Sequence, residues 1–146
     1  MKTRVLMVDD EKEFIETLSE RLTLRDYDVT TALSGDEAVE KVKSYLFDVI
    51  ILDVLMPGMS GIETLREIKK IKPLIEVIML TGNATVETAI EGMKLGALDF
   101  LLKPCETEAL IAKIDKAYAK KTEQDERIRA AKVEELVSSP ISALKE

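Results

Sequence analysis

The stretch VIILDVLMPGMSG, residues 49–61, constrains the fold of this chain more than any other feature. Its first four residues are apolar, three of them are β-branched, and the run ends at the carboxylate of Asp53, before a loop containing Pro57 and Gly58. An apolar run without alternation is typical of a strand buried on both faces, as in a parallel sheet. Asp53 is therefore predicted to lie at the carboxyl end of an interior strand, the edge at which open α/β sheets bind ligands.

Short apolar segments alternate with amphipathic ones along the chain. Predicted strands cover residues 4–8, 28–32, 49–52, 77–80 and 100–102, and an amphipathic segment with helical spacing follows each of them. The fourth of these helices is expected to carry Val86, Ala89, Ile90 and Met93 along one face and to end near Gly96. Three helix starts are predicted by a capping side chain followed three residues later by Glu, at Asp10 and Glu13, Ser34 and Glu37, and Ser60 and Glu63.

Five alternations of strand and helix predict an α/β fold, with a parallel sheet covered by helices on both faces. The pattern alone leaves the strand order open. The flavodoxin-like, doubly wound order 2-1-3-4-5 would place strands one and three side by side, where their carboxyl ends open onto a crevice.

Composition excludes several classes of function. The chain has no histidine, which removes Ser-His-Asp and Cys-His catalysis, the usual zinc sites and any phosphohistidine carrier role. A net charge of −7 disfavours direct binding to nucleic acid. Asp9 and Asp10 interrupt the first apolar run before a signal peptide or membrane span could form, and the single cysteine, Cys105, fits a reducing compartment. We expect a soluble cytoplasmic protein without membrane contact.

Chemically active side chains follow four of the predicted strands: Asp9, Asp10, Asp53, Thr81 and Lys103. Because the carboxyl ends of parallel strands share one edge, we expect these groups to lie together. Clustered carboxylates favour a hard cation, and Mg²⁺ is the natural candidate. Lysine and threonine could then hold a phosphoryl group, with the Asp53 carboxylate as its nucleophile. Each residue also has a simpler interpretation as a helix cap, turn former or solvated charge.

Four motifs, VLMVDDE, VIILDVLMPGMSG, VIMLTG and GALDFLLKP, together resemble the receiver domain of two-component response regulators. The resemblance extends from the start of the chain to about Tyr118 and implies the strand order 2-1-3-4-5. It implies that Asp53 is the phosphoacceptor and that Asp9, Asp10 and Asp53 hold Mg²⁺ together with the backbone carbonyl of Leu55.

The same resemblance assigns a conformational switch. Thr81 would be the switch hydroxyl, Lys103 the contact to the phosphoryl group and Phe100 the switch aromatic. It also implies a cis peptide bond between Lys103 and Pro104. A histidine kinase would be the phosphodonor, an unidentified protein the downstream target, and the domain would catalyse only its own phosphorylation and dephosphorylation.

The motif TGNATVETAIEGMKLGALDFLLKP is similar to receivers of nitrogen-regulator-type activators, but the chain contains no GxxxxGK motif of an ATPase. We predict a receiver domain over residues 1–118 and a helical tail or linker over 119–146 without an output domain, either as a stand-alone protein or as a fragment. The tail has strong helix formers that could extend the fifth helix. A coiled-coil seam fails at its two charged residues, Lys121 and Asp125, when it is drawn through Ile111, Ile114, Tyr118, Lys121, Asp125 and Ile128. A homodimer through the tail, or through the face of the fourth helix, fifth strand and fifth helix, stays open.

Three other functions compete with the receiver interpretation. Aspartate-nucleophile phosphatases resemble one another in a second Asp two positions after the nucleophile, where this chain has Leu55. A flavodoxin-like cofactor binder would meet repulsion between the flavin phosphate and the acidic turn after the first strand. An adaptor that works without phosphorylation would not need the full set of acids.

Overall fold

The computed structural model describes residues 2–82 and 86–138. The strands are β1 (Arg4–Val8), β2 (Asp28–Ala32), β3 (Val49–Leu52), β4 (Glu76–Thr81) and β5 (Asp99–Leu102). The helices are α1 (Lys12–Leu24), α2 (Gly35–Ser44), α3 (Gly61–Ile71), α4 (Val86–Lys94) and α5 (Thr107–Ser138).

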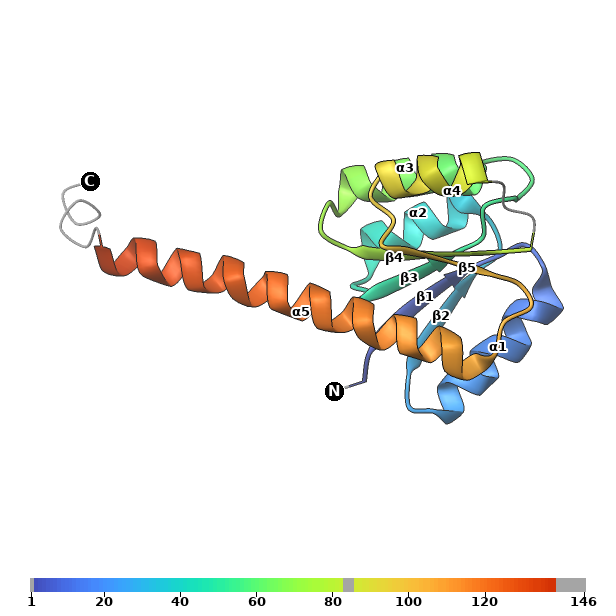
Figure 1. Cartoon of the computed structure of the whole chain (residues 1–146), viewed down its shortest axis with the longest axis horizontal. Helices are drawn as coiled ribbons and strands as arrows, with labels where there is room; N and C mark the ends of the chain where they lie inside the picture. Colours follow the sequence, from blue (N-terminus) through green and yellow to red (C-terminus); the bar gives the residue numbers. More distant parts are fainter. Residues whose placement is uncertain (1, 83–85, 139–146) are drawn as a thin grey trace.

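The strands form one parallel sheet in the order β2-β1-β3-β4-β5 (Figure 1), which confirms the flavodoxin-like order. Helices α2, α3 and α4 lie on one face and α1 and α5 on the other. Each face has its own apolar core, because alternate strand residues such as Ile50 and Ile51 point to opposite sides. All four residues of β3 are buried, as the non-alternating apolar run predicted.

Two of the three predicted helix caps are confirmed. The hydroxyl of Ser34 accepts a hydrogen bond from the N–H of Glu37, and that of Ser60 from the N–H of Glu63. The prediction for Asp10 is wrong, because α1 begins after Glu11 and has no capping side chain. The carboxylate of Asp9 instead accepts the N–H of Glu11 at 2.9 Å, which forms a local turn before the helix.

Two residues of the apolar face predicted for α4 are not buried. Ile90 and Met93 are about half exposed, and Gly92 is the residue that lies buried against the sheet. A Cβ atom at Gly92 would stand 2.2 Å from the sulfur of Met79, so a larger residue there would force the end of the Met79 side chain to move. Gly96 follows the end of α4 with a φ of +105°, which confirms its predicted place at the helix end.

Helix α5 runs without interruption over 32 residues to Ser138, about 48 Å at 1.5 Å per residue. It projects from the sheet and helix layers (Figure 1), which confirms that the tail extends the fifth helix as far as Ser138. Residues 139–146 of the predicted tail lie outside the described residues. No helix in residues 2–82 and 86–138 is long and apolar enough to cross a membrane.

The base of this projecting helix is held by an ion-pair network at the amino edge of the sheet. The buried carboxylate of Asp48, just before β3, lies 3.3 Å from the Nζ of Lys121 on α5. It also accepts hydrogen bonds from the main-chain N–H and the guanidinium of Arg4 on β1. Lys121 therefore faces the domain, which agrees with the failure of the coiled-coil seam at this residue.

Candidate functional site

The strand register brings the predicted site residues to the carboxyl edge of the sheet. Val8 pairs with Leu52, and the N–H of Asp53 donates to the carbonyl of Val8 at 2.9 Å, so β1 and β3 end side by side. On the other side of β4, the N–H of Lys103 donates to the carbonyl of Thr81 at 2.9 Å. Hydrogen bonding between parallel strands thus sets the order of the side chains along this edge.

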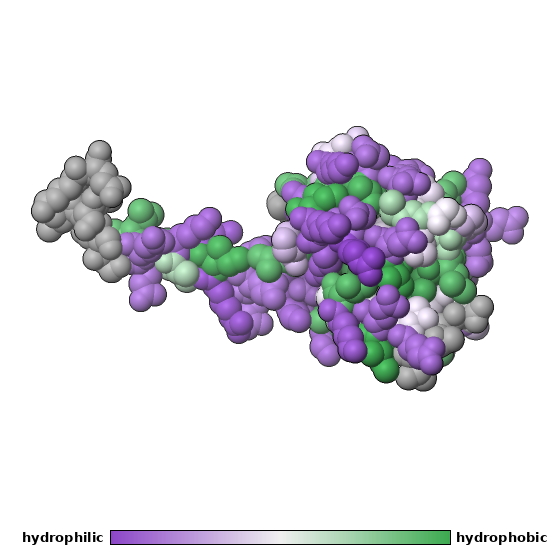
Figure 2. Space-filling model, turned by 90° about the horizontal axis from the view of Figure 1, so that it is seen from above, coloured by the Kyte–Doolittle hydropathy of each residue, from purple (hydrophilic) through white to green (hydrophobic). Residues whose placement is uncertain are grey.

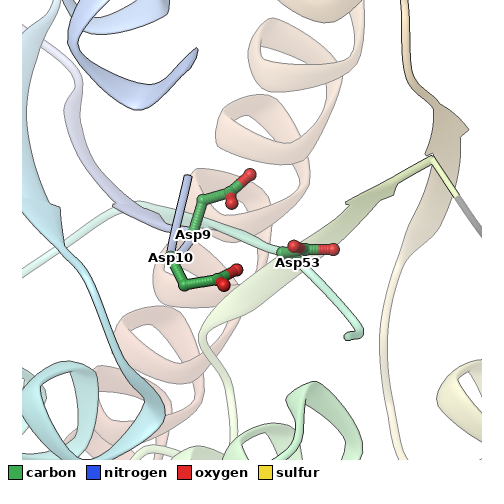
Figure 3. A group of neighbouring side chains, drawn as sticks. All are labelled: Asp9, Asp10 and Asp53. Carbon is green, nitrogen blue, oxygen red and sulfur yellow. The ribbon is translucent and has the colours of Figure 1, made fainter. Parts of the chain in front are cut away.

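Three carboxylates are grouped there. One oxygen each of Asp9, Asp10 and Asp53 lies within 4.8 Å of the others, and Figure 3 shows the side chains arising from the ends of β1 and β3. Asp9 and Asp53 are only 3% and 4% exposed, whereas Asp10 is open to solvent. A cluster with two buried carboxylates and one accessible side fits a hard divalent cation that keeps part of its water shell.

The ammonium group of Lys103 faces this cluster with a positive charge. Its Nζ lies 2.5 Å from Asp9, 3.5 Å from Glu11 and 3.7 Å from Asp53, and the side chain is only 10% exposed. The ring of Phe14 on α1 adds a further contact, with its centroid 4.3 Å from Nζ. Lys103 is therefore not a solvated surface charge.

The electrostatics of the site reflect burial and these close partners. Burial raises the pKa of Asp9, and the negative charge of Asp53 adds to this, against hydrogen bonds from Lys103 and the N–H of Glu11. For Lys103, burial lowers the pKa, but the hydrogen bond to Asp9 and the charges of Asp9, Asp53 and Glu11 outweigh it and raise the pKa overall. The charge of Lys103 thus does not fully offset the burial of Asp9, and a further cation would favour the ionised form of that acid.

The loop after β3 is packed closely against Asp53. The N–H of Leu55 donates to the Asp53 carboxylate at 3.4 Å, and the Leu55 side chain is half exposed. At the start of α3, a Cβ atom on Gly61 would stand 2.2 Å from the carbonyl oxygen of Asp53. The loop therefore depends on glycine at position 61. Metal binding by the Leu55 carbonyl stays a prediction.

The two residues predicted to act as a switch lie on the neighbouring strands. Thr81 is buried at the end of β4, one strand from Asp53. Phe100 on β5 is partly buried and packs with the apolar core on the α2, α3 and α4 face. The peptide bond between Lys103 and Pro104 is cis, as the resemblance implied. The switching roles of Thr81 and Phe100 stay predictions.

Two residues of this site do not follow from sequence reasoning. The sequence indicates Phe14 only as an apolar position of the first helix, and Gly61 only as part of the turn. A buried lysine at a strand end needs protein groups to contact its ammonium, but the sequence does not show which helix supplies them. The sequence also does not predict the close packing of Gly61 against the main chain of Asp53, because this contact depends on the path of the loop.

Residues 5–115 match the response regulator receiver domain, and the chain belongs to this family. The transcriptional regulatory protein ZraR of Escherichia coli K12 is 43% identical over 115 residues, which are 79% of this chain and 26% of ZraR. The chain thus spans about a quarter of the length of this curated relative.

Solved structures of receiver domains and response regulators have the same fold as this chain. A CheY-like receiver domain protein from Methanospirillum hungatei JF-1 has a TM-score of 0.82 at 27% identity, covering 85% of this chain and 99% of that chain. A response regulator from Burkholderia pseudomallei, described with a phosphorylated aspartic acid, a calcium ion and citrate, has a TM-score of 0.75 at 27% identity over 85% of this chain and 73% of that chain. The chain is thus a receiver domain of the two-component type, a signalling domain rather than a classical enzyme.

Proposed function

We propose that Asp53 accepts a phosphoryl group from a histidine kinase. The observation that carries the proposal is the grouping of Asp9, Asp10 and Asp53 within 4.8 Å of one another, with the Lys103 ammonium 3.7 Å from Asp53. A nucleophilic carboxylate with a neighbouring ammonium group is suited to phosphoryl transfer, because the charge on the transferred group needs compensation.

Each side chain has a role in this chemistry. A carboxylate oxygen of Asp53 attacks the phosphorus, the bond from phosphorus to the imidazole nitrogen of the kinase breaks, and the electron pair returns to that nitrogen. Asp9, Asp10, Asp53 and the Leu55 carbonyl would hold Mg²⁺, which supplies positive charge for the phosphoryl oxygens. Lys103 would move from Asp9 toward the phosphoryl group. Hydrolysis of the acyl phosphate by water would end the signal.

A change of packing would follow phosphorylation. Thr81 would turn its hydroxyl toward the phosphoryl group, and Phe100 would repack into the space that Thr81 leaves. Since Phe100 has no hydroxyl, its two states would differ by packing alone. The affected surface would be the face of α4, β5 and α5, where a downstream protein would bind. The exposed side chains of Ile90, Met93 and Leu102 are consistent with such a contact.

On this proposal residues 1–118 are the receiver and residues 119–146 the tail. We place the phosphoryl exchange in the cytoplasm, which agrees with the single free cysteine.

Intact-mass spectrometry tests phosphorylation directly. Wild-type protein incubated with acetyl phosphate and Mg²⁺ should gain one phosphoryl group, while Asp53→Ala should gain none. Chelation of Mg²⁺ should suppress labelling of the wild type. Labelling of Asp53→Ala to the wild-type extent would refute Asp53 as the acceptor, and hydrolysis of small phosphoesters would favour the phosphatase alternative.

A further inference from the structure

The aromatic ring of Phe14 is in contact with the charged end of Lys103. The Nζ atom of Lys103 lies over the face of this ring, 4.3 Å from its centroid. Because the Lys103 side chain is only 10% exposed, little water competes for its ammonium group. The face of an aromatic ring carries partial negative charge and attracts a cation, more strongly where water is excluded. The ring is therefore a charge partner of Lys103 as well as an apolar side chain.

The place of this ring is fixed from two directions. Phe14 lies in the first turn of α1, which begins at Lys12. The turn before α1 is held by the hydrogen bond from the N–H of Glu11 to the carboxylate of Asp9. Phe14 also packs against the apolar core on the α1 and α5 face of the sheet. The ring is thus anchored to the carboxylate cluster on one side and to the core on the other.

The contacts of Lys103 hold its ammonium group on one side of the site. The Nζ atom lies 2.5 Å from Asp9 and 3.5 Å from Glu11, and the ring of Phe14 belongs to the same chain segment. Asp53, at the end of the neighbouring strand, is 3.7 Å away. A movement of Lys103 toward a group attached to Asp53 would therefore be a movement away from the segment that carries the ring.

We propose that Phe14 is a positioning residue that holds the Lys103 ammonium group against Asp9. This inference rests on the proposed function, in which Asp9 binds Mg²⁺ and Lys103 moves toward a phosphoryl group on Asp53. Because the ring stabilises Lys103 at its resting place, it opposes both events. Phe14 therefore raises the Mg²⁺ concentration at which the site is loaded.

A role of Phe14 in the core alone would not have this effect. Phe14→Leu keeps an apolar side chain at the position but removes the negatively charged ring face. If Phe14 only fills space, this substitution would cost the same stability whether or not residue 103 carries a charge, and it would leave the Mg²⁺ affinity unchanged. The two roles are separated by measurements that depend on the charge of Lys103.

The first experiment measures the contact in the metal-free protein, by urea unfolding in the presence of a chelator. It compares the wild type, Phe14→Leu, Lys103→Met and the double variant. Phe14→Leu should raise the unfolding equilibrium constant roughly fivefold more in the wild type than in the Lys103→Met background, where the ring has no cation to hold. Equal effects in the two backgrounds would overturn the proposal.

The second experiment measures Mg²⁺ affinity by isothermal titration calorimetry. Phe14→Leu should bind Mg²⁺ roughly fivefold more tightly than the wild type, and Phe14→Tyr, which keeps an aromatic face, should bind it as the wild type does. In the Lys103→Met background, Phe14→Leu should leave the affinity unchanged. Mg²⁺ binding by Phe14→Leu that is no tighter than that of the wild type would refute the role of the ring.

Fluorinated phenylalanine tests the charge of the ring with little change of shape, and it serves where Phe14→Leu does not fold. Mono-, tri- and pentafluorophenylalanine at position 14 withdraw increasing electron density from the ring face, so the Mg²⁺ dissociation constant should fall along the series. The matched control is the same series at Phe47. That residue is 7% exposed in the core beneath α2, α3 and α4, the side from which Figure 2 views the molecule. An affinity that does not respond to fluorination at position 14 would contradict the proposal.

Failure of this inference and failure of the proposed function give different results. A protein that binds Mg²⁺ and is labelled on Asp53, but whose Mg²⁺ affinity does not respond to the ring, would refute the role of Phe14 alone. Coupling between Phe14 and Lys103 in the metal-free protein without any Mg²⁺ binding would keep the contact, but it would refute the metal site and with it the role of Phe14 in loading.

Discussion

The buried acids of the site oppose one another when no metal is bound. Asp9 and Asp53 are both nearly inaccessible, and Lys103 is closer to Asp9 than to Asp53. Of these two, Asp53 is therefore the carboxylate whose removal costs fewer favourable contacts. Asp53, the proposed phosphoacceptor, is therefore a source of repulsion in the metal-free protein.

Replacement of Asp53 by Ala should leave the free energy of unfolding of the metal-free protein unchanged or raise it by roughly 1 kcal/mol, because a like-charge contact is removed. Urea unfolding in the presence of a chelator measures this. Asp9→Ala is the comparison, since it also removes the ion pair with Lys103 and should destabilise. A clear loss of stability in Asp53→Ala would contradict the repulsion.

Added Mg²⁺ should stabilise the protein saturably, and above saturation the free energy of unfolding should grow with the logarithm of the concentration, by about 1.4 kcal/mol per tenfold step. Because Lys103 holds Asp9, Lys103→Met should bind Mg²⁺ more tightly although its metal-free form is less stable. Melting temperatures across a Mg²⁺ series check both points. Lys43→Met, which changes an exposed lysine, should behave like the wild type. An absence of Mg²⁺ stabilisation would refute the metal site.

The start of α3 and the end of β3 form one closely packed turn. Gly61 lies against the main chain of Asp53 and Val54, so any larger residue there must displace the main chain at Asp53. Gly58 in the same loop has a φ of +75° but open space around it. The two glycines are needed for different reasons, namely close approach and backbone conformation.

Gly61→Ala should therefore lower the free energy of unfolding by more than about 2 kcal/mol and abolish labelling of Asp53, because the overlap is with main-chain atoms. Gly58→Ala should cost only about 1 kcal/mol, from its positive φ, and should leave labelling intact. Denaturant unfolding and intact mass distinguish them. Equal effects of the two substitutions would contradict this explanation.

Sequence pattern predicted the strands and the acid cluster well for a physical reason. A buried parallel strand must be apolar throughout, so a carboxylate at its end is conspicuous, and the register then forces Asp9 next to Asp53. The start of α1 was predicted wrongly, and the spacing of apolar residues in α4 did not indicate that Ile90 and Met93 are half exposed. In α4, Gly92 packs closely on the side chain of Met79. Before α1, the carboxylate of Asp9 accepts a hydrogen bond from the N–H of Glu11. The periodic spacing of apolar residues predicts neither contact.

Across the molecule, Asp48 joins three elements at the edge opposite the site. It binds Arg4 of β1 and Lys121 of α5 from the start of β3. Nothing in the sequence pattern indicates this network, because the partners are far apart along the chain. Burial raises the pKa of Asp48, but the hydrogen bonds from the side chain and main chain of Arg4, its charge and Lys121 outweigh this and lower the pKa overall.

A lowered carboxyl pKa stabilises the fold above the unfolded value of about 3.9, and the contribution is lost as the pH falls through the folded pKa. Asp48→Asn should therefore lower the free energy of unfolding by about 2 kcal/mol at pH 7, with the difference from wild type shrinking below about pH 4. Urea unfolding across pH 3 to 7 measures this. Asp36→Asn, at an exposed position, should change stability little, and a constant difference for Asp48→Asn down to pH 3 would refute the assignment.

Strand β3 begins directly after Asp48 and ends directly before Asp53. Asp48 and Asp53 are the two ends of a single buried span of about 17 Å, at 3.3 Å per residue over five steps. The proposed phosphoacceptor, Asp53, and the attachment point of the long helix, Asp48, are therefore joined by one straight piece of backbone. A displacement of β3 along its axis at one end would therefore also move the other end. The strand is the shortest covalent connection between the carboxylate cluster and the residue that holds Lys121 of α5.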